Sequence, residues 1–313
     1  MRNFALSFNA VAPLFFIVMI GYWIRGRKMV DEHSLTEFNH VSYYLFISVN
    51  LFFSIYQSAL SAAANWRLVG FCIIGVILEC IVGMLFIPCI ESDSASAGAM
   101  MQSMFRTNLV LVGLPIAAGL YENELGAISI VTAILVPFYN VLGVFFLERY
   151  RSGSASVRKI AKGIITNPLV IAAVLGILFS INGWKLPYAA EKTVRYFSQG
   201  CTAVALFILG ASLNFGAPGN SHRRKDLITC LVLRLLVFPI LSVTIAILMG
   251  FRGAELVAIL SAFGCPLGTV TYAIAQQMDS DSELAGELVF FSTVFSCLTL
   301  FLQIFTLKEL SYI

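Results

Sequence analysis

RTNLVLVGLP, residues 106–115, places an arginine, an asparagine and a glycine–proline pair inside an otherwise apolar segment. That segment, residues 100–121, is close to the ~20 residues that a helix needs to cross the hydrocarbon core of a bilayer. A charged side chain, a side-chain amide and a proline are each costly where a helix faces lipid. The stretch therefore predicts a polar site inside the membrane rather than an ordinary lipid-facing helix.

The composition of the whole chain is that of a membrane protein. Of its 313 residues, 59% are hydrophobic and only 12% are charged, and the mean hydropathy is +0.88. Soluble domains carry about 25% charged residues. Charged residues at half of that frequency are too few to cover the surface of a soluble protein of this length, so we expect lipid to cover the apolar part of the surface.

Apolar segments of similar length recur along the chain and predict an all-α membrane protein with ten transmembrane helices. None of them shows the alternation of a barrel strand. The first run ends in basic residues without a small-residue cleavage site, which favours a retained span over a signal peptide. The ten predicted spans are residues 5–24, 37–60, 66–90, 100–121, 126–147, 166–183, 193–214, 227–250, 254–278 and 285–307.

The sequence argues against several other classes of protein. A net charge of +3, without a basic stripe or a glycine-rich phosphate loop, gives no sign of a nucleic-acid partner. The seven cysteines lie in apolar runs without metal-ligand spacing, and the three histidines are far apart, so we expect no metal and no cofactor. No span carries a serine–histidine or two-aspartate arrangement, so we expect no catalytic residues and no enzyme.

The longest polar break, Glu148–Lys162, lies near the middle of the chain and is rich in arginine, lysine, glycine and serine. It predicts a basic cytoplasmic linker, residues 151–165, between two five-helix repeats at 1–150 and 166–313. Lysine and arginine are more frequent in the odd-numbered loops, which places those loops in the cytoplasm and both termini outside the cell membrane.

The two halves also resemble each other in sequence. LFI at residues 45–47 recurs at 206–208, and GLP at 113–115 is matched by GCP at 264–266, in the same order and at similar offsets. Because each half has an odd number of spans, such a repeat has to be inverted across the membrane.

The glycine–proline pairs at 113–115 and 264–266 predict that the fourth and ninth spans are broken near their middles. Paired interrupted spans in corresponding positions indicate a transporter binding site, where half-helix N-termini offer partial positive charge to an anion. The alternative for either span alone is a plain proline kink, since glycine and proline are common in membrane helices.

Polar residues near the two breaks are candidates for substrate contact. Asn108 lies seven residues before Pro115, which on a continuous helix places both on one face. Gly268 and Thr269 follow Pro266 and supply further polar groups. Such residues also form hydrogen bonds between helices; for Asn108 we favour substrate contact.

Three of the charged residues inside predicted spans lie away from the ends of their spans. Arg106 either binds a carboxylate, or acts in gating, or extends to the interface from the start of its span. Arg234 has no evident partner in the sequence. Glu79 either carries a coupling proton or pairs with a basic side chain.

RTNLVLVGLPIAAGLY (residues 106–121) resembles the fourth span of the auxin efflux carrier family, which includes bacterial malonate and malate carriers and plant auxin exporters. The family pattern has an asparagine seven residues before a proline, matched here by Asn108, Gly113 and Pro115. AFGCPLGTVTYAIAQQM (262–278) resembles the ninth span and GIITNPLVIAAVLGILFSINGWKLP (163–187) the sixth.

The resemblance implies ten spans in two inverted repeats, with broken helices 4 and 9 that cross, in a fold similar to that of bile acid:sodium symporters. It implies organic-anion substrates, elevator-type alternating access and a homodimer. Many relatives have a proline near residues 49–51, where this chain has Asn50, which could itself reach the substrate.

Together these observations predict a secondary active transporter of small organic anions, such as malonate, malate or auxin-like acids. The predicted site comprises Asn50, Asn108, Gly113, Pro115, Cys265, Pro266, Gly268 and Thr269. Uniport and coupling to H+ or Na+ stay open. The alternative is a membrane-embedded ligand sensor or channel of the same fold.

Overall fold

The computed structural model describes residues 2–57, 65–121, 124–151, 157–213 and 221–313. These residues form helices and no β-strand, with one isolated antiparallel bridge, so the all-α prediction is confirmed. In chain order the helices are α1 (Arg2–Gly26), α2 (Glu32–Val41), the π-helical turn η1 (Ser42–Ile47), α3 (Ser48–Gln57), α4 (Trp66–Ile90), α5 (Ser94–Phe105), the π-helical turn η2 (Leu109–Gly113), α6 (Leu114–Leu120), α7 (Gly126–Arg151), α8 (Val157–Thr166), α9 (Pro168–Asn182), α10 (Tyr188–Ser212), α11 (Ser221–Val232), the π-helical turn η3 (Leu233–Val237), α12 (Phe238–Leu248), α13 (Gly253–Gly264), α14 (Thr271–Gln277) and α15 (Ser282–Glu309).

Five helical segments among the described residues are long and apolar enough to cross a membrane. They are Trp66–Ile90, Gly126–Arg151, Tyr188–Ser212, Arg223–Leu248 and Ser282–Glu309. Four shorter apolar helices fall within further predicted spans: Pro13–Gly26, Leu109–Leu120, Pro168–Asn182 and Gly253–Gly264. The predicted second span is divided among α2, η1 and α3.

Polar residues begin several of these helices, as the sequence requires. The side-chain oxygens of Asp31, Asn65, Asp93, Asn167 and Asp281 each accept a hydrogen bond from a backbone N–H in the first turn of the helix that follows. Such caps satisfy amides that have no partner within the helix. They mark where apolar helices start after short polar connections.

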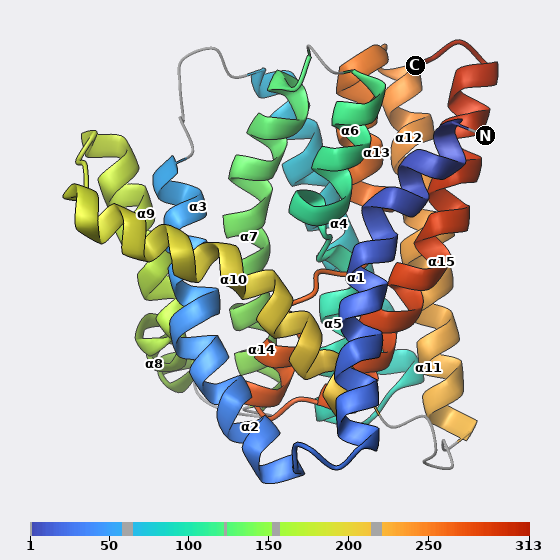
Figure 1. Ribbon diagram of the computed structural model, residues 1–313. Coiled ribbons are helices and arrows are strands. Elements are labelled where there is room, and N and C mark those ends of the chain that lie inside the picture. Colours follow the sequence, from blue (N-terminus) through green and yellow to red (C-terminus); the bar gives the residue numbers. More distant parts are fainter. Residues whose placement is uncertain (1, 58–64, 122–123, 152–156, 214–220) are drawn as a thin grey trace.

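The helices pack side by side in a bundle (Figure 1), in which α1 lies along α10 and α15, and α3 lies along α9. Two glycines allow the contact between α1 and α10. A Cβ atom on Gly21 would lie 2.3 Å from the carbonyl oxygen of Phe207, and one on Gly210 would lie 2.0 Å from that of Val18. Close approach at small residues is typical of helix packing in membranes.

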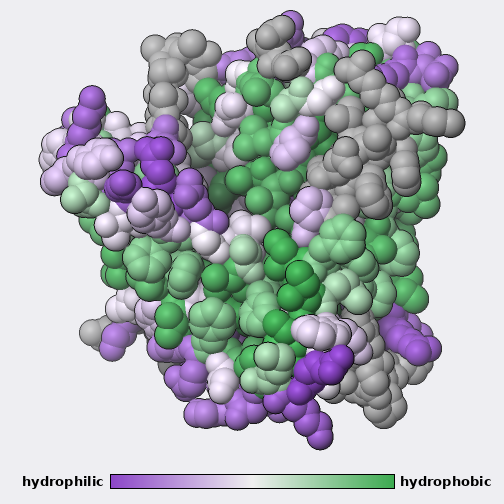
Figure 2. Space-filling view, in the orientation of Figure 1, coloured by the Kyte–Doolittle hydropathy of each residue, from purple (hydrophilic) through white to green (hydrophobic). Residues whose placement is uncertain are grey.

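The outer surface of the molecule suits a bilayer. Figure 2 shows apolar residues across the middle of the visible face and hydrophilic residues gathered toward its two ends. Large apolar side chains project from α4, α9, α12 and α15, among them Leu85, Ile181, Leu248 and Leu298. The first turn of α1 and the C-terminal residues lie at the same end of the bundle (Figure 1).

Candidate functional site

Two interrupted helices meet near the centre of the bundle. The first is α5, which ends at Phe105 and resumes as η2 and α6 after the non-helical residues 106–108. The second is α13, which ends at Gly264 and resumes as α14 after residues 265–270. Both predicted spans are therefore broken rather than merely kinked.

The two breaks satisfy each other's backbone groups. Thr107 and Leu267 form an antiparallel bridge, and the Asn108 N–H donates to the carbonyl oxygen of Pro266 at 2.9 Å. The Leu267 N–H donates to the Ser292 hydroxyl at 3.1 Å. Backbone groups freed in a membrane need such partners, because lipid offers none.

The first break lies earlier than predicted. The helix continues through the Gly113–Pro115 pair, because Pro115 occupies the first turn of α6, where a missing N–H does little harm. The interruption falls instead at 106–108, where the Asn108 side-chain oxygen accepts from the Leu111 N–H and caps η2. In the second span the proline prediction is right, since Pro266 lies within the break.

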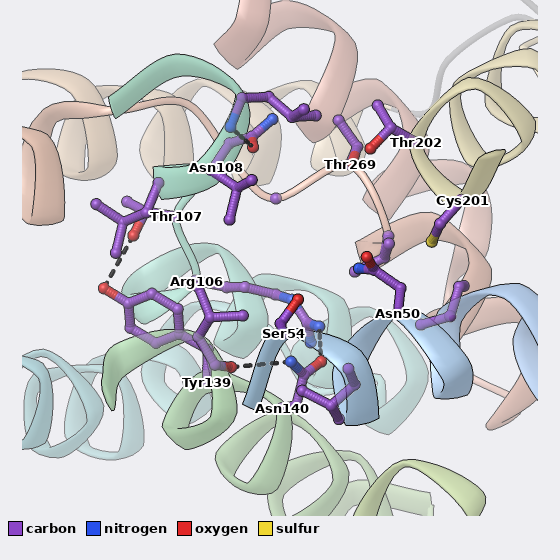
Figure 3. A pocket seen from close by; sticks show the side chains of 18 residues that line it. Asn50, Ser54, Arg106, Thr107, Asn108, Tyr139, Asn140, Cys201, Thr202 and Thr269 are labelled. Carbon is purple, nitrogen blue, oxygen red and sulfur yellow. Dashed lines mark hydrogen bonds between the residues drawn. The ribbon is translucent and has the colours of Figure 1, made fainter. Parts of the chain in front are cut away.

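A cavity of about 110 Å³ lies beside the two breaks and between the elements that surround them. Sites for drug-sized ligands occupy roughly 300–1,000 Å³, so this cavity suits a much smaller molecule. Its labelled side chains are shown in Figure 3. Most of its lining is apolar and includes Ile47, Leu51, Val110 and Val136. The polar residues that line it are Asn50, Ser54, Arg106, Thr107, Asn108, Tyr139, Asn140, Thr202 and Thr269.

Arg106 is the cationic side chain of this cavity. It is 3% exposed, and its guanidinium donates to Gln102 Oε1 at 3.2 Å and to Asn140 Oδ1. In the part of the chain that the structure describes, no carboxylate lies within 4.0 Å of it. Of the alternatives for Arg106, extension to the interface is therefore excluded, because the side chain is buried in the cavity.

A glycine of α7 makes room for this guanidinium. A Cβ atom on Gly143 would lie 2.7 Å from Arg106 Nη1. Asn140, one turn earlier on α7, accepts the hydrogen bond from Arg106 (Figure 3) and donates to its own helix at the Val136 carbonyl. Helix α7 thus positions the cation against the break.

Asn108 offers an unused hydrogen-bond donor. Its Nδ2 is buried and has no partner among the described residues, whereas its Oδ1 is engaged by the Leu111 N–H. Asn50 also lines the cavity, and its Oδ1 accepts from the Ser198 hydroxyl at 2.7 Å. The Thr107 hydroxyl already bonds within the protein, since it lies 2.9 Å from the Tyr139 hydroxyl and donates to the Ala262 carbonyl at 3.1 Å.

The structure brings Asn50, Arg106, Asn108, Gly268 and Thr269 to one cavity. The other predicted site residues lie elsewhere. Pro115 is exposed, so it does not share a face with the buried Asn108 as predicted. Gly113 packs on Ser261 and Cys265, while Cys265 and Pro266 are buried in the second break without lining the cavity. Glu79 lies away from the cavity, 3.8 Å from Arg234 Nη1.

Several lining residues were not predicted. Asn140, Tyr139, Ser54 and Thr202 lie within apolar segments of the sequence, and only packing shows which of them face the cavity. The sequence could have indicated Asn140 as a site residue, because an amide in the middle of an apolar span needs a polar partner.

The fold and the cavity indicate a multi-pass membrane protein with an internal cavity that a buried arginine lines, and comparison with known proteins gives its class. The sequence profile of the membrane transport protein family matches residues 6–304, so the chain belongs to this family, the group of the auxin efflux carriers. An uncharacterized transporter of Methanothermobacter thermautotrophicus is 25% identical over 298 residues, which cover 94% of this chain and 96% of that protein. These findings confirm the resemblance and indicate a membrane transporter rather than an enzyme.

Proposed function

We propose that this protein is a secondary active transporter of small organic anions, with carboxylates such as malonate or malate as the substrate class. The observation that carries the proposal is a buried arginine, Arg106, that faces a small cavity without a carboxylate partner among the described residues. A buried charge is costly unless it is paired. A carboxylate that enters the cavity would provide that pairing.

The remaining groups of the cavity suit the same ligand. Arginine has five N–H donors in a planar fork, and bonds to Gln102 and Asn140 leave others for a carboxylate. The free Nδ2 of Asn108 supplies a second, neutral donor. The N-terminus of the η2–α6 segment begins at the same point and adds partial positive charge. The small cavity favours malonate and malate over bulkier auxin-like acids.

The proposal includes the predicted architecture of ten spans in two inverted five-helix repeats. Two broken helices, one from each half of the chain, meet at the cavity, which is the arrangement that inverted-repeat transporters use. In this scheme one group of helices carries the site across the membrane in an elevator-type movement. A homodimer in the cell membrane, with the linker around α8 in the cytoplasm and both termini outside, belongs to the same proposal.

The test is uptake and efflux of labelled malonate, malate and indole-3-acetate by proteoliposomes, with the pH and sodium gradients varied separately. Asn108→Ala should reduce the flux about tenfold, since it removes a donor in the site and the cap of η2. Asn182→Ala is the matched control, because Asn182 is exposed and bonds only to its own helix at Leu178 among the described contacts.

The outcomes separate the parts of the proposal. Flux that is unchanged in a folded Asn108→Ala variant would remove Asn108 from the site while leaving the carrier function intact. Binding of an anion without any flux would favour the sensor. Flux that is insensitive to both gradients would identify a uniporter or a channel.

A further inference from the structure

A second buried arginine lies at the crossing but away from the cavity. Arg234 belongs to η3, within the helical segment formed by α11, η3 and α12, and its side chain is 1% exposed. It is the largest fully buried side chain among the described residues. Turns of π-helix occur often at functional sites, since they re-aim a side chain without ending the helix.

The guanidinium of Arg234 binds the ends of both interrupted helices. Its Nη1 donates to the carbonyl oxygen of Met104 in the last turn of α5, at 3.2 Å. Its Nη2 and Nε donate to the carbonyl oxygen of Cys265, which caps the C-terminus of α13, at 3.3 and 3.4 Å. One side chain thus joins the two helices that the breaks interrupt.

Helix C-termini attract cations. The last carbonyls of a helix lack intrahelical partners and carry the negative end of the helix dipole. Transporters with broken helices use these carbonyls to coordinate a coupling cation such as Na+. Here Arg234 already donates to the carbonyls of both helix ends.

The charge of Arg234 is balanced inside the protein. Glu79 of α4 is 4% exposed, and its Oε1 lies 3.8 Å from Arg234 Nη1. Neither oxygen of Glu79 has a hydrogen-bond donor among the described residues, which makes Arg234 its electrostatic partner. Arg234 therefore leaves no net charge for a ligand at this position.

We propose that Arg234 is a resident cation, which occupies the place where a cation-coupled carrier would bind its ion and holds the two helix ends together. The native protein then needs no sodium at the crossing. Arg234 is a positioning residue: it sets the geometry of the breaks and, through them, of Arg106 and Asn108. The consequence for transport rests on the proposed function; the cation site itself does not.

The experiment removes the side chain and supplies the cation from solution. Purified wild type and Arg234→Ala are heated in choline, sodium and guanidinium chlorides at millimolar concentration, below the denaturing range and without substrate. The wild-type melting temperature should be the same in all three salts. Arg234→Ala should melt at a lower temperature in choline and recover part of the loss in guanidinium, with a smaller recovery in sodium.

Flux is then measured in the same salts. Arg234→Ala should transport about tenfold more slowly in choline, because an uncompensated Glu79 is left buried, and guanidinium should restore part of the rate. Arg234→Lys should keep more activity than Arg234→Ala without added guanidinium. The matched control is Arg223→Ala, which removes an arginine of the same helical segment that pairs with Glu283 and Glu287 near the surface and should show no rescue.

Distinct results would overturn the inference. Sodium-dependent melting or flux in wild type would show that the crossing binds an ion in addition to Arg234. A folded Arg234→Ala that responds to no cation would show that the site is only packing. If Arg234→Ala does not fold, the double variant Glu79→Gln/Arg234→Ala removes both charges. This double variant should fold, and its melting temperature should not respond to any of the cations. A response to a cation would contradict the pairing of Glu79 with Arg234. Rescue of melting without flux of any anion would uphold the cation site and reject the proposed substrate class.

Discussion

Arg106 and Arg234 lie beside the same pair of interrupted helices, and both are almost completely buried, yet they differ in what surrounds them. Arg234 contacts two helix ends and a carboxylate, so its positive charge is balanced by groups of the protein itself. Arg106 contacts two neutral amide oxygens and faces a cavity. Under the proposed function, the internal counter-charge, and not the residue type, distinguishes the arginine that holds the fold together from the one that binds a ligand.

The strongest test of this comparison is the free energy of unfolding. Glu79→Gln removes the carboxylate beside Arg234, and breaking a buried pair in this way costs about 3–5 kcal/mol. Arg106→Gln removes a charge that has no carboxylate partner among the described residues, so the protein without substrate should be at least as stable as wild type. Thermal melting should therefore give a lower melting temperature for Glu79→Gln than for wild type. The melting temperature of Arg106→Gln should be equal to that of wild type or higher.

The control for charge removal is Glu283→Gln, which breaks an exposed pair with Arg223 and should cost about 0–1 kcal/mol. Equal losses in Glu79→Gln and Arg106→Gln would show that both arginines are structural, and the assignment of Arg106 to the substrate would fail. Arg106→Gln should in any case weaken substrate binding, by about 1.5–3 kcal/mol for a charged hydrogen-bonded group.

A smaller effect is expected from Gly143→Ala, which tests the position of Arg106 without changing its charge. The added methyl group would start 2.7 Å from Arg106 Nη1, so the guanidinium has to move. Such overpacking costs about 1–3 kcal/mol, which we expect as weaker substrate binding rather than as lost expression. Isothermal titration with malonate, or KM for flux, would measure it.

Gly126→Ala on the same helix is the matched control, because nothing lies within 4 Å of the added Cβ among the described atoms. In an Arg106→Gln background, Gly143→Ala should have no further effect on binding. Additive losses would mean that Gly143 acts on something other than Arg106.

The sequence was sufficient to predict the class of protein, the apolar segments and five of the cavity residues, because hydropathy and helix breakers act locally. Asn50, Asn108 and Thr269 are polar residues inside apolar segments, and such residues are costly in a membrane unless they face the protein interior or a cavity. The sequence alone could not predict that Arg234 and Glu79 pair, since the two residues come from helices far apart in the chain. The role of Gly143 depends in the same way on the packing of α7 against the break.

The position of the first break was predicted wrongly for a physical reason that can be tested. A proline at the start of a helix is compatible with helical geometry, and its fixed φ even favours that position. Pro115 stands at this position in α6 and is exposed, whereas Pro266 is buried in its break and accepts the Asn108 N–H at its carbonyl. The same residue type thus lies in the first turn of α6, within the continuous η2–α6 segment, in one half of the chain and within the break in the other.

Pro115→Ala should consequently have the smallest effect of the variants considered. Alanine also suits the first turn of a helix, and the loss of a proline in a compatible position costs about 0.4–1 kcal/mol through the unfolded state. No cavity contact is lost, so KM for the transported anion should match wild type, as measured in proteoliposomes beside Asn108→Ala. A large rise in KM for Pro115→Ala would place Pro115 at the site after all, and would mean that the helix opens at the Gly113–Pro115 pair in another state of the transport cycle.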